Sequence, residues 1–119
     1  MRLMQQGVKL MADNNYDIKL TLSPGAKKEF LKKLSGRIIK ILYLIEDEQK
    51  GATPGTAESY IRGQIFELNS ANILFDNTLT DVLIKLNSVL KYKEVEFAQV
   101  RKQLLEAKGI VDHLQKQIQ

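Results

Sequence analysis

The sequence contains no cysteine, no tryptophan, a single histidine and only two prolines among its 119 residues. Without cysteine, a disulfide framework, a zinc–thiolate centre and a thiol nucleophile are all excluded. The longest apolar run, at residues 41–45, is far shorter than the roughly 20 residues that a membrane-spanning helix needs. The first ten residues also lack the apolar core of a signal peptide, so we expect a cytoplasmic protein.

The length and charge of the chain favour one ordinary folded domain. A chain of 119 residues can bury a core without metal or disulfide support. We assign residues 1–16 to a flexible N-terminal tail and residues 17–119 to a single helical domain. The net charge of +4 is compatible with nucleic-acid binding but too mild to indicate it.

Glycine and proline punctuate the first half of the chain, whereas residues 64–108 contain neither. A stretch of that length without them is typical of helix. We therefore predict an all-α protein, a helical bundle or coiled coil. Its long amphipathic helices are expected at about 24–49, 56–76 and 78–118, preceded by a short extended arm at 17–22.

The first predicted helix has a clear beginning and an unusual end. Ser23 is placed to cap it, and Pro24 occupies the first helical position, where its missing N–H costs nothing. The last turn carries Glu46, Asp47 and Glu48, which have the wrong sign for the negative end of a helix dipole. We expect a basic group to face this cluster, or the cluster to mark a contact surface.

The boundary between the second and third helices is predicted at residues 76–78, where side chains compete for backbone hydrogen bonds. Thr78 would cap a new helix there, with Asp81 three residues later. The alternative is one uninterrupted helix. Nearby, Asn72 lies in the apolar seam, where it would either fix an oligomer's register or bind water at the bundle edge.

Two rows of residues with seven-residue spacing run from Leu79 to Ile118, and Lys93 is their only charged member. A straight helix here would be about 60 Å long. It either bends near residues 91–93 and folds back, or projects and pairs with another chain. Because the period stays close to 3.5, we favour pairing and expect a homo-oligomer, most simply a dimer. The predicted interface residues are Leu79, Leu83, Leu86, Leu90, Phe97, Val100, Leu104, Val111 and Leu114.

The sequence offers little for catalysis. The only histidine, His113, has no convergent partners beyond Asp112 and Lys116 nearby. The helical carboxylates lack the E-x-x-H companion of di-iron bundles, and residues 51–55 lack the lysine of a phosphate-binding loop. We expect no enzymatic activity, no metal and no cofactor.

A basic run on the first helix is the main charged feature. Lys33, Arg37 and Lys40 share one stripe opposite the apolar face. Such a stripe could hold phosphates of nucleic acid or another anion. The alternative is the solvated back of an amphipathic helix.

The alternating stretch at residues 17–22 needs a partner strand, and none is evident in this chain. A strand, then Ser-Pro, then a basic helix resembles the ribbon-helix-helix repressors over residues 16–48. That resemblance implies an intersubunit ribbon with Lys19 and Thr21 at base edges, and a turn at Ser35-Gly36. The apolar period, however, continues through Gly36 and favours one helix.

Our leading hypothesis is a non-enzymatic helical protein that mediates protein–protein interaction, by self-association or by binding a protein partner. The alternative is a small dimeric DNA-binding regulator. A further alternative is an antagonist or immunity protein of a phage or mobile element, because the Lys-, Ile- and Asn-rich composition suits a low-GC bacterium or its phages. We expect no membrane partner.

Overall fold

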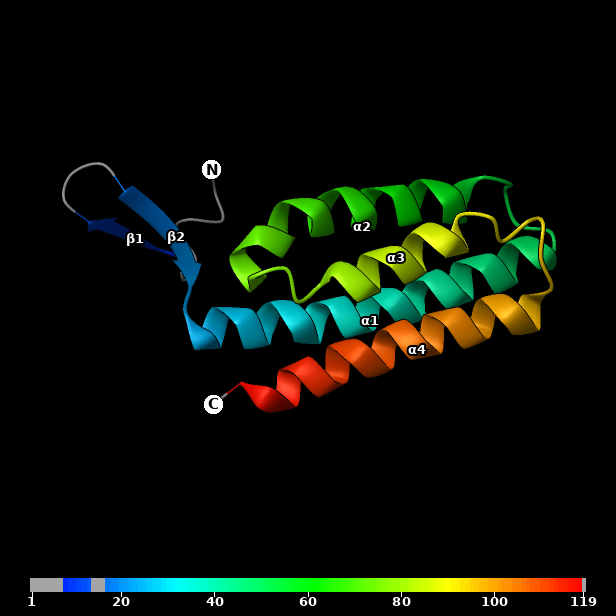
Figure 1. Ribbon diagram of the computed structural model, residues 1–119. Helices are drawn as coiled ribbons and strands as arrows, with labels where there is room; N and C mark the ends of the chain where they lie inside the picture. The colour runs from blue at the N-terminus through cyan, green and yellow to red at the C-terminus, as the bar shows by residue number, and fades with distance from the viewer. Residues whose placement is uncertain (1–7, 14–16, 119) are drawn as a thin grey trace.

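The computed structural model describes residues 8–13 and 17–118, with side chains for residues 22–118. In this part of the chain, two strands precede four α-helices and one short 3-10 helix (Figure 1). The predicted all-α fold class is confirmed. The elements are β1 (Val8–Asp13), β2 (Asp17–Leu22), α1 (Pro24–Gln49), α2 (Thr56–Asn72), η2 (Ile73–Phe75), α3 (Thr80–Val89) and α4 (Phe97–Gln117).

The four helices form an up-down-up-down bundle, in which each helix runs antiparallel to the one before it (Figure 1). α1 packs against α2 and α4, and α3 packs against the same two helices. Each helix contributes a buried apolar row at three- and four-residue spacing, which is what fills the centre of such a bundle. The largest fully buried side chains are Leu31, Leu34, Ile38, Ile41, Ile45, Ile61, Leu68, Leu79, Val82, Leu86, Val89 and Leu104.

α1 begins and ends where the sequence predicted. The Ser23 hydroxyl accepts a hydrogen bond from the Ala26 backbone N–H at 3.2 Å, and Pro24 is the first helical residue. The helix then continues through Gly36 to Gln49 without interruption. The turn at Ser35-Gly36 implied by the ribbon-helix-helix resemblance is therefore absent, because the apolar row carries the helix across it.

The strand at residues 17–22 has its partner within the same chain. β1 pairs antiparallel with β2, from Val8 opposite Leu22 to Asp13 opposite Asp17. From the sequence, no second strand was evident and residues 8–13 were expected in the tail, so this pairing is a correction. The hairpin lies beyond the end of the bundle where α1 begins (Figure 1). The remaining tail residues, 1–7 and 14–16, lie outside the described residues.

The predicted break between α2 and α3 is present, but Thr78 does not cap α3. Its hydroxyl donates to the Phe75 carbonyl at 2.7 Å, and α3 begins at Thr80. Asp76 and Asn77 turn the chain with φ of 51° and 63°, a left-handed conformation that these residue types tolerate.

The Asn72 side chain organises this turn. Its Oδ1 accepts from the Leu79 N–H at 2.9 Å, and its Nδ2 donates to the Thr80 hydroxyl at 3.1 Å. Asn72 thus bonds to Leu79, which directly precedes α3, and to Thr80, its first residue, so its polar group serves the connection between two helices of one chain.

The heptad rows do not form one projecting helix. α3 ends at Val89, and α4 begins at Phe97 and runs antiparallel to α3. The folding-back alternative near residues 91–93 is therefore the observed one, and the pairing arrangement that we favoured for this stretch is corrected. Lys93, the charged interruption in the rows, lies in the connection and is exposed, while Tyr92 beside it is buried.

Candidate functional site

The residues predicted to form an oligomer interface lie inside this chain's own bundle. Folding α4 back on α3 and α1 turns both heptad rows toward a common core, so their apolar area is buried without a second chain. In this conformation they present no free surface of any size. Leu79, Leu83, Leu86, Val100, Leu104 and Val111 are buried, and Leu90, Phe97 and Leu114 pack partly buried against them.

The predicted anion-binding stripe lies at the edge of α1 that faces α2. Arg37 forms an ion pair with Glu67 of α2, and the Lys40 ammonium lies 4.9 Å from the centre of the Tyr60 ring. Lys33 is exposed. Two of the three cations therefore have partners within the chain. The side chains of Lys19 and Thr21, the other two predicted contacts, lie outside the described residues.

The acidic cluster at the end of α1 has the charge of Lys93 nearby, but its hydrogen-bond partners are not basic side chains. Instead, the Glu48 carboxylate accepts hydrogen bonds from the backbone N–H groups of Ala57 at 2.6 Å and Gly55 at 3.2 Å. These groups belong to the start of α2, whose partial positive charge favours a carboxylate. Gly55 has no side chain to cap α2, and Glu48 performs that task from the preceding helix.

Tyr92 completes this cluster from the α3–α4 connection. Its hydroxyl donates to the Glu48 carboxylate at 2.9 Å. Burial raises the pKa of Glu48, but the bonds from Ala57, Tyr92 and Gly55 and the charge of Lys93 outweigh it and leave the pKa below the ordinary value. Burial and the neighbouring carboxylate raise the pKa of Tyr92 to about 12. The Glu48 carboxylate is held by three structural donors, so it helps to hold this end of the bundle together.

A second polar link joins α1 to α4. The Ser35 hydroxyl donates to Asp112 Oδ1 at 2.8 Å, and Lys108 Nζ donates to Oδ2 at 2.6 Å. Burial alone would raise the pKa of Asp112. The bonds from Lys108 and Ser35 and the charges of Lys108 and Lys116 outweigh that effect and leave the pKa below its ordinary value. Asp112 is therefore a structural anion that two donors already hold.

His113 is exposed on α4, with its Nε2 3.1 Å from the Gln117 side-chain nitrogen. No carboxylate lies with it in a group that could bind a metal, and no such group occurs elsewhere among the described residues. No described helix combines the length and the apolar composition that crossing a bilayer requires.

The feature that these contacts leave unexplained is a set of large apolar side chains in solvent. Phe66 on α2, Ile73 at the end of α2 and Ile84 on α3 are 76 %, 75 % and 59 % exposed. Around them, most outward residues of both helices carry no charge; the charged exceptions are Arg62, Glu67 and Asp81. We call this surface the α2–α3 face, and it consists of Phe66, Asn69, Ser70, Ile73, Thr80, Ile84, Asn87 and Ser88, all exposed.

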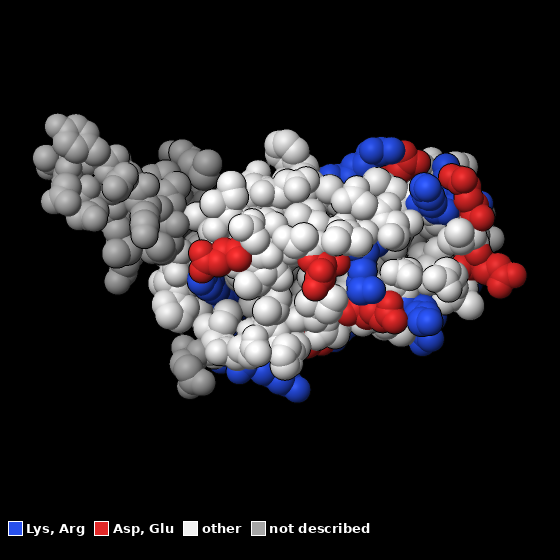
Figure 2. All heavy atoms as spheres, in the orientation of Figure 1, with Lys and Arg blue, Asp and Glu red and all other residues white. Residues whose placement is uncertain are grey.

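The two helices bring these side chains into one surface because the Asn72 turn sets their alignment. Asn72 lies level with Thr80. One helical turn back along α2 and one turn forward along α3, Asn69 therefore lies level with Ile84. Phe66 and Ile73 lie on either side of Asn69, two turns apart on the same side of α2. Figure 2 shows that uncharged side chains cover much of α2 and α3 on this side, with separate charged groups among them and more charge toward the end where α1 connects to α2.

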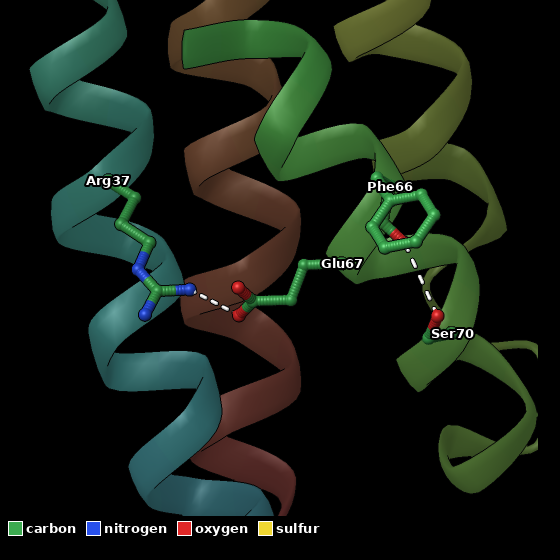
Figure 3. A network of polar contacts seen from close by, with 4 residues as sticks. All are labelled: Arg37, Phe66, Glu67 and Ser70. Carbon is green, nitrogen blue, oxygen red and sulfur yellow. Dashed lines mark hydrogen bonds and ion pairs between the residues drawn. The ribbon is translucent and has the colours of Figure 1, made fainter.

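The nearest charge on the α1 side of α2 is neutralised within the chain. Glu67 points toward Arg37, whereas Phe66 and Ser70 lie on another side of α2 (Figure 3). The Ser70 hydroxyl donates to the Phe66 carbonyl at 3.4 Å, so its polar group is directed along the helix. Near the other end of α2, Arg62 pairs with Glu58.

This face was not predicted from the sequence, in which Phe66 and Ile73 were given no role. The core row of α2 includes Ile61 and Leu68, which are buried. The seven-residue spacing of Phe66 and Ile73, out of phase with the core row, was the signal that could have identified a second apolar stripe.

Comparisons of the chain with protein-family models, with curated proteins and with solved structures found no match.

Proposed function

We propose that the protein is a non-enzymatic helical interaction protein that binds an α-helix of a protein partner on its α2–α3 face. The observation that carries this proposal is the exposure of Phe66, Ile73 and Ile84 on two adjoining helices. Single exposed apolar residues are common, but a contiguous patch of a few hundred Å² is typical of a binding surface.

The surroundings of these side chains support the same function. Ser70, Asn69 and Ser88 are small or polar without charge, so a partner can cover these three positions without desolvating an ion. The charges that border the face on α2 are paired, Arg37 with Glu67 and Arg62 with Glu58. An apolar centre with a polar rim is the usual arrangement of a protein–protein interface.

The form of the surface favours a helix as its occupant. On α2, the exposed residues recur at steps of four and three, which is the spacing that lets two helices pack knobs into holes. From Gly63 to Ile73, small residues alternate with large ones along this row, so a second helix can lie close to α2. The row consists of Ser59, Gly63, Phe66, Ser70 and Ile73, all exposed.

The proposal is tested by the size of the native complex. In extracts of cells that naturally make the protein, gel filtration of the wild type should show it in an assembly larger than its 13.6 kDa monomer. Phe66→Asp places a charge at the centre of the face and should shift the protein to the monomer position.

Tyr43→Asp is the matched control, because Tyr43 is an aromatic residue 59 % exposed on the outer side of α1. It should leave the elution position unchanged. A wild-type protein that elutes only as a monomer would contradict the proposal. So would an assembly that survives Phe66→Asp, or one that Tyr43→Asp disrupts equally.

A further inference from the structure

We infer that the helix that occupies the α2–α3 face is α2 of a second copy of this chain, packed antiparallel around a two-fold axis. This inference rests on the proposed function, since it names the partner for the same face. A two-fold dimer requires a surface that is complementary to itself. The exposed row of α2 has that property in one particular register.

In this register, each large side chain of α2 lies opposite a small one of the second copy. If the two helices cross with Phe66 facing Ser70 of the second copy, symmetry also places Ser70 against its Phe66. The same alignment places Ile73 opposite Gly63 at both ends. A Cβ at Gly63 would meet no atom of its own chain within 4 Å, so the space above it is open to a neighbouring side chain.

The resulting seam is continuously apolar. Along the axis, the large side chains alternate between the two copies: Ile73, Phe66, Phe66 and Ile73, one every three or four residues. Sliding the helices by one heptad would instead set Ser59 against Ser70 and separate the apolar layers. Parallel packing would set Phe66 against Phe66 and Gly63 against Gly63, which leaves large beside large and small beside small.

Charge permits the self-association as well. Two copies of one face bring identical charges together, which normally opposes a symmetric dimer. On α2, Glu67 is already paired with Arg37, and Arg62 with Glu58, so the exposed charges that border the row are compensated within the chain.

The symmetry also gives Ile84 a role. The two-fold axis passes between the two α2 helices and is perpendicular to both. It therefore places α3 and α3 of the second copy on the same side of the seam. Ile84 lies on this flank, where it is 59 % exposed in the single chain. The dimer would therefore cover all three exposed apolar side chains.

The expected affinity is modest. One pair of helices of 17 residues, with a flanking contact, buries less than the roughly 1,600 Å² of a standard interface. We therefore expect a reversible dimer with a dissociation constant in the micromolar range.

Sedimentation equilibrium of the purified full chain tests the partner. The wild type should fit a monomer–dimer equilibrium between micromolar and millimolar concentration. Phe66→Ser removes both central rings and should weaken dimerisation at least about tenfold, whereas Tyr43→Ser should not change it. Circular dichroism should show the same helix content for all three proteins, because both positions are exposed.

Cysteine pairing tests the register, and the absence of native cysteine makes the result unambiguous. Gly63→Cys and Ile73→Cys chains are mixed in equal amounts and mildly oxidised. The mixed disulfide between the two variants should dominate. Two copies of Gly63→Cys should link poorly, because their cysteines would lie about 15 Å apart along the helix axis.

The outcomes separate this inference from the proposed function. A strictly monomeric purified chain would overturn the inference. The proposed function would still stand if the cell extract contained a larger assembly that Phe66→Asp disrupts. A dimer that forms homodisulfides of Gly63→Cys instead of the mixed species would overturn the antiparallel register.

Discussion

The Tyr92 hydroxyl donates to the Glu48 carboxylate at 2.9 Å, across 44 positions of sequence. Glu48 belongs to the last turn of α1, and it also accepts from the first N–H groups of α2. One carboxylate thereby ties the end of α1, the start of α2 and the α3–α4 connection together. This contact holds in place the connection at which the heptad rows are folded back into the bundle.

Glu48→Ala should lower the free energy of unfolding by about 2 kcal/mol, because three hydrogen bonds to a charged acceptor are lost. Tyr92→Phe removes only one of the three and should cost about 1 kcal/mol. Urea titration measures both. Asp47→Ala is the control, since Asp47 is exposed at the negative end of the same helix. It should be neutral or slightly stabilising, and an equal loss from Asp47→Ala would contradict the role of Glu48.

Tyr92 should give the fold a specific alkaline sensitivity. Its pKa is raised from 10.0 to about 12, so the folded state holds the hydroxyl proton more tightly than the unfolded state. Its contribution is complete below pH 10 and is lost as the pH rises toward 12. Urea titrations across this range should show a steeper decline for the wild type than for Tyr92→Phe. Parallel declines would show that Tyr92 does not sense the pH.

Acid should act through Glu48 and Asp112, whose pKa values are both lowered in the folded state. The unfolded chain then binds protons more readily than the folded one. Their contribution is complete above their ordinary values of 4.5 and 3.8 and is lost as the pH falls below them. The variant Glu48→Gln/Asp112→Asn should be less stable than the wild type at neutral pH, with a gap that narrows in acid. A gap that stays constant would contradict this assignment.

Ser35 and Asp112 should be energetically coupled, because the hydroxyl donates to the carboxylate at 2.8 Å between α1 and α4. In a double-mutant cycle of Ser35→Ala and Asp112→Ala, urea unfolding should give a coupling energy of about 1 kcal/mol. The partly exposed pair of Lys108 and Asp112 lies within α4 and should give less, about 0.4 kcal/mol. Additive effects at Ser35 and Asp112 would exclude the link.

Asn72→Ala should destabilise the fold by about 1–2 kcal/mol, because the Leu79 N–H and the Thr80 hydroxyl lose their partner. Asn87→Ala is a matched control. The Asn87 side chain bonds only to the Leu83 carbonyl one turn earlier, so its loss should stay within about 0.5 kcal/mol. If Asn72→Ala were equally mild, the turn would be set by the backbone alone.

Local chemistry explains which parts of the fold the sequence could predict. The start of α1 depends on Ser23 and Pro24, which act on the three or four residues after them. The row of apolar residues across Gly36 likewise outweighed the turn that the ribbon-helix-helix resemblance implied. Both features are decided within a few residues of where they occur.

The seven-residue spacing of the heptad rows could be recognised in the sequence, but the helix against which they pack could not. The same spacing serves a helix that pairs with another chain and a helix that folds back on its own. In the folded-back chain, the hydroxyl of Tyr92, which lies between α3 and α4, bonds to Glu48 in a distant helix. Periodicity within the rows contains no information about that contact.

The candidate site was missed for a related reason. Phe66 and Ile73 are ordinary apolar residues in the sequence, and only the finished bundle shows that they point away from the core. The acidic cluster was noticed, but Glu48 accepts from backbone N–H groups at the start of a helix. Every residue type except proline has such a group, so the sequence does not indicate which ones it binds.

Photo-cross-linking from within the α2–α3 face tests the central claim most directly. Benzoylphenylalanine replaces Phe66 in one form of the full chain and Tyr43 in another, and both are irradiated in the cells that naturally make the protein. We expect one discrete adduct from position 66, which Ile73→Asp should abolish, and none from position 43. The mass of the adduct identifies the partner, and twice the chain mass would indicate a second copy. No adduct from position 66, or the same adducts from both positions, would contradict the assignment of the α2–α3 face as the binding surface.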